Sequence, residues 1–190
     1  RDDVESRGLG DVYKRQAVCE NGNYYNRFYF VHPDGAVQHY DKKHLFTFGG
    51  EHKRFTAGTE RVVVNFRGVR ILLEVCYDLR FPVWSRNLGD YDMILYVASW
   101  PTPRVDAWSA LLRARAIENQ CYVAGVNRMG TDPACEYSGG SAIIDPYGKT
   151  IAECPWSRES AVSADIDMEA LQAFRKKFPV LDDADPFTLI

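Results

Sequence analysis

Residues 69–82 read VRILLEVCYDLRFP and are the most informative stretch of this chain. Five of the seven residues 69–75 are apolar, and a short run of this kind is typical of a strand inside a sheet. The run ends at Cys76, where polar residues and Pro82 break the pattern. A strand end that leads into a turn can hold a nucleophile rigid and accessible, with backbone N–H groups beside it.

Cys76 is therefore the first candidate for a reactive residue. The alternative is that Cys76 packs in the core, since free cysteine is among the most buried residue types. Five dispersed cysteines without a C-x-x-C pair argue against a disulfide framework and a structural zinc site. A thiol redox protein is disfavoured too, because no resolving cysteine lies near Cys76 in sequence.

Hairpin strands are predicted before this stretch, and strands mixed with helices after it. Turn residues at Pro33-Asp34-Gly35 and Arg67-Gly68 predict two hairpins. The expected hairpin strands cover residues 27–31 with 36–40, and 61–66 with 69–75; further strands are expected over 93–98, 121–127, 140–144 and 149–154. This mixture predicts an α/β (α+β) fold and excludes a purely parallel layout.

Two helices are predicted in the second half of the chain. Thr102 is the expected N-cap of the first, with Pro103 at its first helical position and its end near Gln120. The second begins near Asp167 and is stopped by Pro179.

Residues 1–16 differ from the rest, because charges of both signs alternate with glycines and no periodicity can be traced. We expect a non-native-looking or disordered leader over residues 1–16 and one domain over residues 17–190. A chain of 190 residues is long enough for one substantial core.

Composition excludes several classes of function. With 46% hydrophobic and 26% charged residues the chain resembles an ordinary globular protein. A net charge of -3 gives no basic footprint for nucleic acid. No apolar run approaches the ~20 residues of a membrane helix, and the opening residues lack the apolar core of a signal peptide. We expect a cytoplasmic protein that contacts neither nucleic acid nor membrane.

A second unusual segment, residues 40–46, places Lys42, Lys43 and His44 directly after a predicted strand. A lysine held near a thiol favours the thiolate and can stabilise an oxyanion, whereas the alternative is a solvated basic turn. Only one of two adjacent lysines on an extended segment can face the thiol. A pairing of Cys76 with one of the four histidines also stays open; these are His32, His39, His44 and His52.

These segments recur in one order. Tyr40-x-Lys42-x-His44-Leu45-Phe46 is followed by Glu51 with Phe55-x-x-Gly58, the Cys76 box, Ser99-Trp100-Pro101, residues 114–120, Asn127-Arg128 and Gly139-Gly140-Ser141. The ordered set resembles the nitrilase superfamily of carbon–nitrogen hydrolases from about Asn21 to the last helix. The box at 76–82 and the WPTPR stretch at 100–104 resemble its omega-amidase-like branch most closely.

The resemblance implies a four-layer α-β-β-α sandwich and a glutamate–lysine–cysteine triad. Cys76 is then the nucleophile, Lys42 rather than Lys43 is the triad lysine, and Glu51 supports that lysine. The Tyr77 N–H and the Lys42 ammonium would hold the oxyanion. No metal and no organic cofactor enter the implied chemistry.

The implied reaction is hydrolysis of the terminal amide of a small dicarboxylic acid monoamide. A thioester forms on Cys76, ammonia leaves, and water frees the acid. Arg80 and Arg104 are candidates for the substrate carboxylate, beside Trp100, because guanidinium binds carboxylate bidentately. The alternative for both arginines is ion pairing within the protein.

This sequence differs from the family at one catalytic position, the general-base glutamate. It lies well upstream of the lysine, and neither Glu5 nor Glu20 has the matching context. We therefore expect the chain to lack the N-terminal strand and helix unit of the sandwich. The alternative function is a catalytically inactive fragment or pseudoenzyme of the same fold.

The resemblance also implies a homodimer. Residues 81–88 carry Phe81, Val83, Trp84 and Leu88, more apolar surface than a short solvated helix usually shows. We expect this segment to contribute to the dimer surface.

Overall fold

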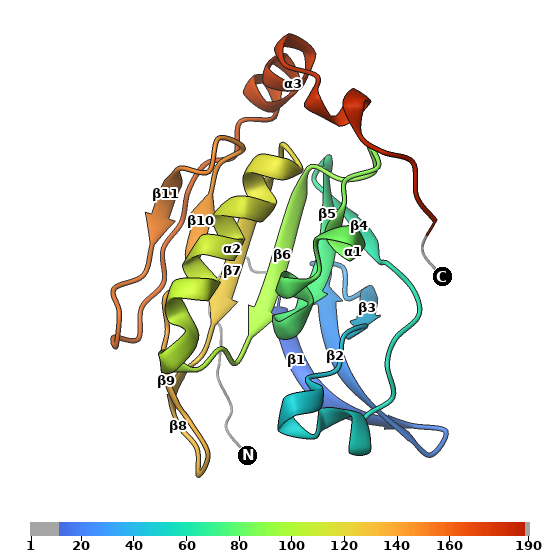
Figure 1. Ribbon diagram of the computed structural model, residues 1–190, viewed down its shortest axis with the longest axis vertical. Helices are drawn as coiled ribbons and strands as arrows, with labels where there is room; N and C mark the ends of the chain where they lie inside the picture. The colour runs from blue at the N-terminus through green and yellow to red at the C-terminus, as the bar shows by residue number, and fades with distance from the viewer. Residues whose placement is uncertain (1–11, 189–190) are drawn as a thin grey trace.

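A computed structural model describes residues 12–188 of the protein (Figure 1). Its main sheet has six strands in the order β11-β10-β7-β6-β5-β4. The central strands β5, β6 and β7 run parallel, and the outer pairs are antiparallel. The strands are β4 (Val63–Phe66), β5 (Val69–Val75), β6 (Met93–Ala98), β7 (Tyr122–Asn127), β10 (Ala142–Ile144) and β11 (Thr150–Glu153). The predicted strands and the mixed α/β class are confirmed.

A second sheet of three antiparallel strands contains the first predicted hairpin. Its strands are β1 (Val12–Glu20), β2 (Asn23–Val31) and β3 (Val37–Asp41). Residues 12–16 of the expected leader belong to strand β1, where Val12 pairs with Val31; the rest of that segment lies outside the described residues. A two-stranded ribbon, β8 (Met129–Thr131) with β9 (Glu136–Ser138), was not predicted.

Alternation along β5 explains how the layers stack. Ile71, Leu73 and Val75 face the three-stranded sheet and form one core with its apolar side chains. Leu72 faces the other way, toward Trp108 and the rest of helix α2 (Val105–Glu118). Period-two alternation thus makes one strand serve two cores. Helix, large sheet and small sheet form three successive layers (Figure 1).

The close packing of α2 against the sheet depends on Gly125 in β7. A Cβ atom built there would lie 2.7 Å from atoms of both Trp108 and Leu112. Contacts this short do not occur between real side chains, so a larger residue would force Trp108 or Leu112 to move.

The expected start of the long helix is wrong. Thr102 opens a 3-10 turn, η4 (Thr102–Arg104), and α2 begins only at Val105, with Arg104 at its N-cap and no side-chain cap. The buried Thr102 hydroxyl has no hydrogen-bond partner among the described residues. Pro101 and Pro103 flank Thr102 and restrict the backbone on both sides of it, which the local cap signal does not reveal.

The expected start of the last helix is confirmed. Helix α3 (Met168–Lys177) begins after Asp167, whose carboxylate accepts a hydrogen bond of 2.8 Å from Ala170 N. Leu171 enters the core between the sheets, and Arg175 donates to Asp92 Oδ1 at 2.8 Å. Asp92 precedes β6, so α3 lies at the amino ends of the parallel strands and leaves their carboxyl ends to the site.

The remaining elements are short. Helix α1 (Pro82–Ser85) holds Trp84 inside the core, whereas Val83 and Leu88 are 57% and 61% exposed. Of the apolar residues expected at a dimer surface, Trp84 is therefore unavailable. The other 3-10 turns are η1 (Thr47–Gly49), η2 (Glu51–Lys53), η3 (Cys76–Arg80) and η5 (Val180–Asp183). Within residues 12–188, no helix has the length and apolar character needed to span a bilayer.

Candidate active site

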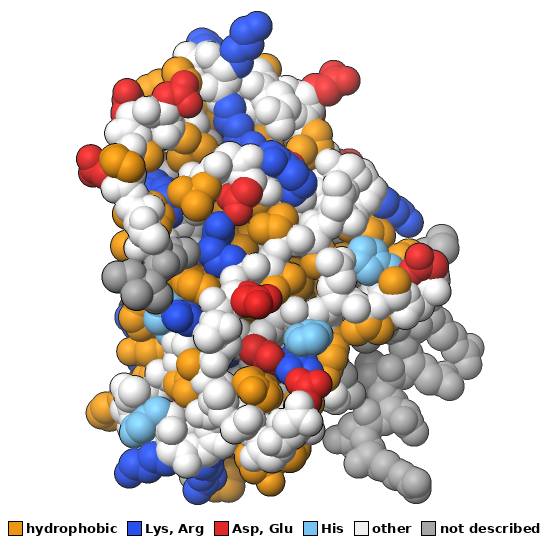
Figure 2. All heavy atoms as spheres, turned by 90° about the vertical axis from the view of Figure 1, so that its right-hand side faces the viewer, with side chains coloured by type: hydrophobic (Ala, Val, Ile, Leu, Met, Phe, Trp, Pro, Cys, Tyr) orange, Lys and Arg blue, Asp and Glu red, His pale blue; other side chains and the backbone are white. Residues whose placement is uncertain are grey.

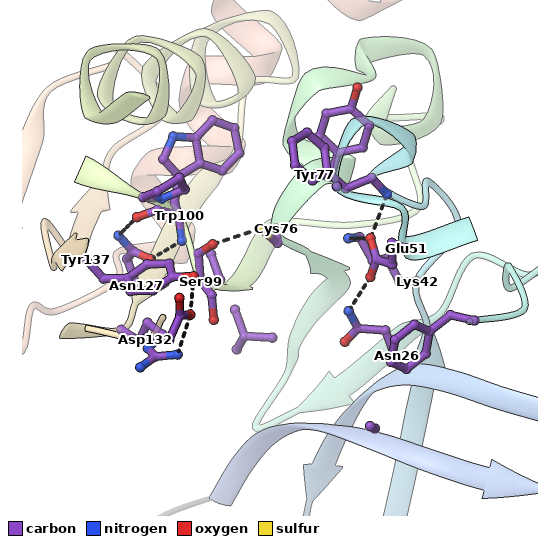
Figure 3. A pocket seen from close by; sticks show the side chains of 18 of the residues that line it. Asn26, Lys42, Glu51, Cys76, Tyr77, Ser99, Trp100, Asn127, Asp132 and Tyr137 are labelled. Atoms are coloured by element: carbon purple, nitrogen blue, oxygen red, sulfur yellow. Dashed lines mark hydrogen bonds and ion pairs between the residues drawn. The ribbon is translucent and has the colours of Figure 1, made fainter. Parts of the chain in front are cut away.

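A cavity of about 1370 Å³ opens where β5 and β6 end. It brings together seven residues singled out from sequence: Lys42, Glu51, Cys76, Tyr77, Arg80, Trp100 and Arg104. They come from segments far apart in the chain, and Figure 3 shows Lys42 and Glu51 on one side of the space with Trp100 on the other.

Cys76 is the first residue of the turn η3 and directly follows β5. Its backbone φ is +50°, in the left-handed region that costs a non-glycine residue about 1–2 kcal/mol. The side chain is half-buried and packs against both cores, and the thiol contacts the Ser99 carbonyl oxygen at 3.7 Å. A strained residue at a strand-to-helix bend presents its side chain to a cavity instead of to one face of the sheet.

Lys42 follows strand β3 and is almost fully buried. Its ammonium lies 2.6 Å from Glu51 Oε2, which also accepts a hydrogen bond of 2.6 Å from Phe46 N. Glu51 Oε1 accepts one of 2.7 Å from Asn26 Nδ2. These polar groups are largely removed from water, so each would be left without a hydrogen-bond partner if the others were absent.

The charge state of Glu51 follows from its partners. Burial opposes the charged carboxylate, but the Lys42 ammonium and the hydrogen bonds from Lys42, Phe46 and Asn26 outweigh burial and hold the pKa of Glu51 below its ordinary value. The carboxylate is therefore charged at neutral pH and pairs with the lysine.

The two adjacent lysines diverge as their alternation on an extended segment requires. Lys42 lines the cavity, while the Lys43 ammonium lies 5.2 Å from the centre of the Trp84 ring, outside it. The Lys42 ammonium lies 5.9 Å from the centre of the Tyr77 ring, next to Cys76 in the chain.

Guanidinium groups supply most of the remaining positive charge in the cavity. Arg80 lies over the Trp100 ring at 4.9 Å, and Arg104 lies over the Phe46 ring at 5.5 Å. Among the described residues neither forms an ion pair. The alternative expected from sequence, internal ion pairing, is thus not seen there, and both groups stay available to an anion.

Several site residues escaped prediction as functional groups. Asn127 ends β7 and fixes the Trp100 segment: its Oδ1 accepts from Trp100 N at 2.7 Å, and its Nδ2 donates to Trp100 O at 3.0 Å. Asn26 holds Glu51 from β2. For Asn127 the available signal was position, because side chains at the carboxyl ends of neighbouring parallel strands meet at one edge. Asn26 lies inside an antiparallel strand, and no such signal marked it.

The β8–β9 ribbon adds Asp132 and Tyr137 to the cavity wall. Asp132 accepts from the Tyr137 hydroxyl at 2.8 Å and lies 3.7 Å from the Arg128 guanidinium. This edge of the cavity is more exposed than the Lys42–Glu51 side.

No histidine of the described chain lines the cavity with Cys76. His44 pairs with Asp78 instead, at 2.8 Å from Nδ1 to Oδ1, and His32 contacts Gln38. The open Cys–His pairing therefore finds no support in geometry. Over residues 12–188 no cluster of three or more His, Cys, Asp or Glu side chains could hold a metal ion.

Known proteins share this sequence and fold. A sequence model of the carbon–nitrogen hydrolase family matches residues 9–176. The chain is 55% identical over 165 residues to omega-amidase YafV of Escherichia coli K12, covering 86% of this chain and 64% of that protein. It is 41% identical over 183 residues to 2-oxoglutaramate amidase of Bacillus subtilis, covering 95% of this chain and 70% of that protein.

A solved structure agrees with these relatives. The crystal structure of XC1258 from Xanthomonas campestris, described as a CN-hydrolase superfamily protein with an arsenic adduct in its active site, superposes with a TM-score of 0.91 at 45% identity. The match covers 94% of this chain and 71% of that one. The chain thus spans about two-thirds of the length of these relatives. With its nitrilase-type sandwich layers and its match over most of the sequence, the chain belongs to the carbon–nitrogen hydrolase family of the nitrilase superfamily.

Proposed function

We propose that this site cleaves the terminal amide of a small dicarboxylic acid monoamide, with Cys76 as nucleophile. One observation carries the proposal: a buried lysine paired with a glutamate at 2.6 Å lines the same cavity as a cysteine in a strained bend. The names of the relatives, omega-amidase and 2-oxoglutaramate amidase, agree with this substrate class.

In the first half of the proposed reaction the Cys76 sulfur attacks the amide carbonyl carbon. The C–S bond forms, the C–N bond breaks, and the thiol proton leaves with the nitrogen as ammonia. An amide is a poor electrophile, so the step needs charge stabilisation at the carbonyl oxygen. The Lys42 ammonium and the Tyr77 N–H are the proposed donors, and Glu51 holds the lysine in place through its 2.6 Å contact.

Arg80 and Arg104 are the proposed partners of the remote carboxylate of the substrate. Both line the cavity, both lie over aromatic rings, and guanidinium groups bind carboxylates with two parallel hydrogen bonds. Trp100 forms the wall between Arg80 and the helix α2 side.

In the second half water attacks the thioester and releases the acid, which needs a carboxylate base to take a proton from that water. Of the described residues, Glu51 and Asp132 are the carboxylates that line the cavity. Both Glu51 oxygens already accept hydrogen bonds. This observation favours the second candidate function, a catalytically inactive protein of the same fold, for the 190-residue chain on its own.

Succinamate incubated with the purified chain tests both candidates through ammonia release and intact mass. We expect slow acylation of Cys76 with turnover lower by roughly 10²–10⁴-fold than in a protein with a positioned base. Cys76→Ala should abolish the acyl adduct. No adduct in either protein would reject the proposed nucleophile, whereas rapid turnover would mean that Glu51, Asp132 or another carboxylate of this chain serves as the base.

Labelling tests the same residue without substrate. Limited iodoacetamide treatment followed by peptide mapping should modify Cys76 and spare Cys121, which is fully buried and whose thiol pKa burial raises far above the ordinary range. Labelling of Cys19 or Cys135 with Cys76 untouched would contradict the proposal.

A further inference from the structure

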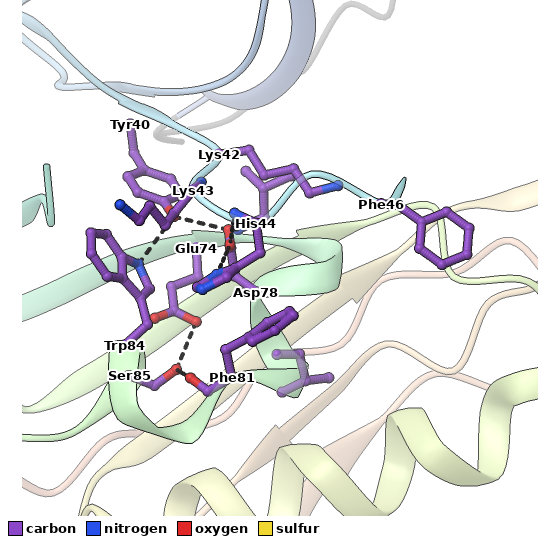
Figure 4. Close-up of polar contacts among 12 residues, drawn as sticks. Tyr40, Lys42, Lys43, His44, Phe46, Glu74, Asp78, Phe81, Trp84 and Ser85 are labelled. Atoms are coloured by element: carbon purple, nitrogen blue, oxygen red, sulfur yellow. Dashed lines mark hydrogen bonds and ion pairs between the residues drawn. The ribbon is translucent and has the colours of Figure 1, made fainter. Parts of the chain in front are cut away.

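A buried carboxylate lies directly behind the candidate nucleophile. Asp78 is 0% exposed and sits two residues after Cys76 in the turn η3. Its two oxygens accept four hydrogen bonds, one from each of four donors: Tyr40 OH, His44 N, His44 Nδ1 and Val75 N, at 2.8–3.0 Å. Figure 4 shows Tyr40 and His44 directed toward Asp78. A carboxylate has about four acceptor sites, so Asp78 is fully satisfied without water.

Three of these donors come from the segment that carries Lys42. Tyr40 precedes Lys42 by two residues and His44 follows it by two, so Asp78 holds the chain on both sides of the lysine. Burial, followed by the charges of Asp78 and Glu74, raises the pKa of Tyr40, so its hydroxyl keeps the proton that it donates.

The Tyr40 hydroxyl also binds the main chain at Lys43, the residue after Lys42. It accepts hydrogen bonds from Lys43 N at 3.1 Å and from Trp84 Nε1 at 3.2 Å. The His44 ring stacks on Phe81 with 3.7 Å between ring centroids and 4° between the planes. The main chain after Lys42 is thereby attached to η3 and α1 at several points.

The fourth donor comes from the segment that carries the nucleophile. Val75 N donates to Asp78 Oδ2 at 3.0 Å, and Val75 is the residue before the strained Cys76. One carboxylate therefore joins the main chain beside Cys76 to the main chain beside Lys42. The ion pair with Glu51 restrains only the end of the lysine side chain.

We propose that Asp78 is a positioning residue that sets the Lys42 ammonium relative to the Cys76 thiol, with the Tyr40 hydroxyl as its second point of attachment. The inference rests on the proposed function, in which Lys42 activates Cys76. Asp78 touches neither substrate nor reacting atoms in this role; it acts through the backbone of both segments.

The rate of Cys76 alkylation by iodoacetamide at pH 7, read by peptide mass, tests the inference without turnover. An ammonium near a thiol raises the thiolate fraction, so displacing Lys42 should slow alkylation. We expect Asp78→Asn to slow it by about tenfold, because the Lys42 ammonium is then displaced relative to the thiol. Tyr40→Phe should slow it by a smaller factor. Mere loosening of the fold would do the opposite, because it would expose the thiol.

A double-mutant comparison separates positioning from general damage. In a Lys42→Met background Asp78→Asn and Tyr40→Phe should cause no further slowing, because the cation on which they act is gone. Ser85→Ala is the matched control: its buried hydroxyl bonds Glu74 and Phe81 O in the same region but reaches neither the Lys42 segment nor Val75, so alkylation should be unchanged.

The outcomes are distinguishable. An unchanged or faster rate in Asp78→Asn and Tyr40→Phe, or equal slowing with and without Lys42, would overturn the positioning role. If Asp78→Asn does not fold, Tyr40→Phe alone decides, because it removes one hydroxyl and keeps the ring. If Lys42→Met itself leaves the alkylation of Cys76 unchanged, the Cys–Lys pairing of the proposed function fails instead.

Discussion

Glu51 holds Lys42 in a pair that water hardly reaches, with 2.6 Å between the carboxylate and the ammonium. The lysine side chain is 3% exposed and the glutamate side chain 13%. A buried pair gives little net stability over apolar residues, but removal of one partner leaves a desolvated charge. We therefore infer that the main effect of the pair is to hold an ammonium at the cavity wall.

Substitution of Glu51 by Gln should destabilise the fold as well as slow acylation. We expect the free energy of unfolding in urea to fall by about 3 kcal/mol, the lower end for breaking a buried pair. Glu20→Gln is the matched control. The Glu20 side chain is 54% exposed, and without it Arg27 still pairs with Asp41. This substitution should cost less than about 1 kcal/mol. Equal losses in the two variants would contradict this account.

Glu74 should make stability fall as pH rises. It is fully buried; burial, followed by the charge of Asp78, raises the pKa of Glu74 to about 8. A carboxyl whose pKa is higher in the folded state binds its proton more tightly there. Its stabilisation is present below the ordinary value of 4.5 and is lost as pH rises through about 8.

Glu74→Gln should remove this pH dependence, because an amide does not titrate. Urea unfolding at pH 5, 6.5 and 8 should show wild-type stability falling with pH and a flatter profile in the variant. Parallel profiles would mean that Glu74 does not carry the effect.

Arg80 and Arg104 should discriminate between charged and uncharged amides. Replacing either by Gln removes a charge-assisted contact worth about 1.5–3 kcal/mol, so the concentration of succinamate for half-maximal acylation of Cys76 should rise about tenfold or more. An uncharged amide of similar size is the internal control and should be affected little. Equal effects on both amides would assign these arginines a structural role.

The predicted homodimer would bury the exposed apolar side chains of Val83 and Leu88. Light scattering at micromolar concentration should give a dimer for the wild type and a monomer for Val83→Asp with Leu88→Asp. Val37→Asp offers a control of similar exposure on β3 and should leave the dimer intact. A wild type that is monomeric throughout would reject the prediction.

Local signals in the sequence were sufficient for most of the strands, and they marked Cys76 as a candidate that the family resemblance then favoured. Apolar runs, turn residues such as Pro33-Asp34-Gly35 and the Asp167 cap act over a few residues, so their effect can be read without the rest of the chain. The predicted start of α2 was wrong because local signals do not show how the segment through Pro101 packs beside Asn127.

By itself the sequence determined that a buried strand ends at Cys76 and that a Lys42 motif and a Glu51 loop precede it. Only the tertiary structure decided that Glu51 is held from β2 by Asn26, that Asn127 fixes the Trp100 segment, and that Asp78 joins the two segments of the site. The physical reason is distance along the chain. A hydrogen bond between residues 34 positions apart, as between Asp78 and His44, exists only after sheet pairing and core packing have brought both backbones together.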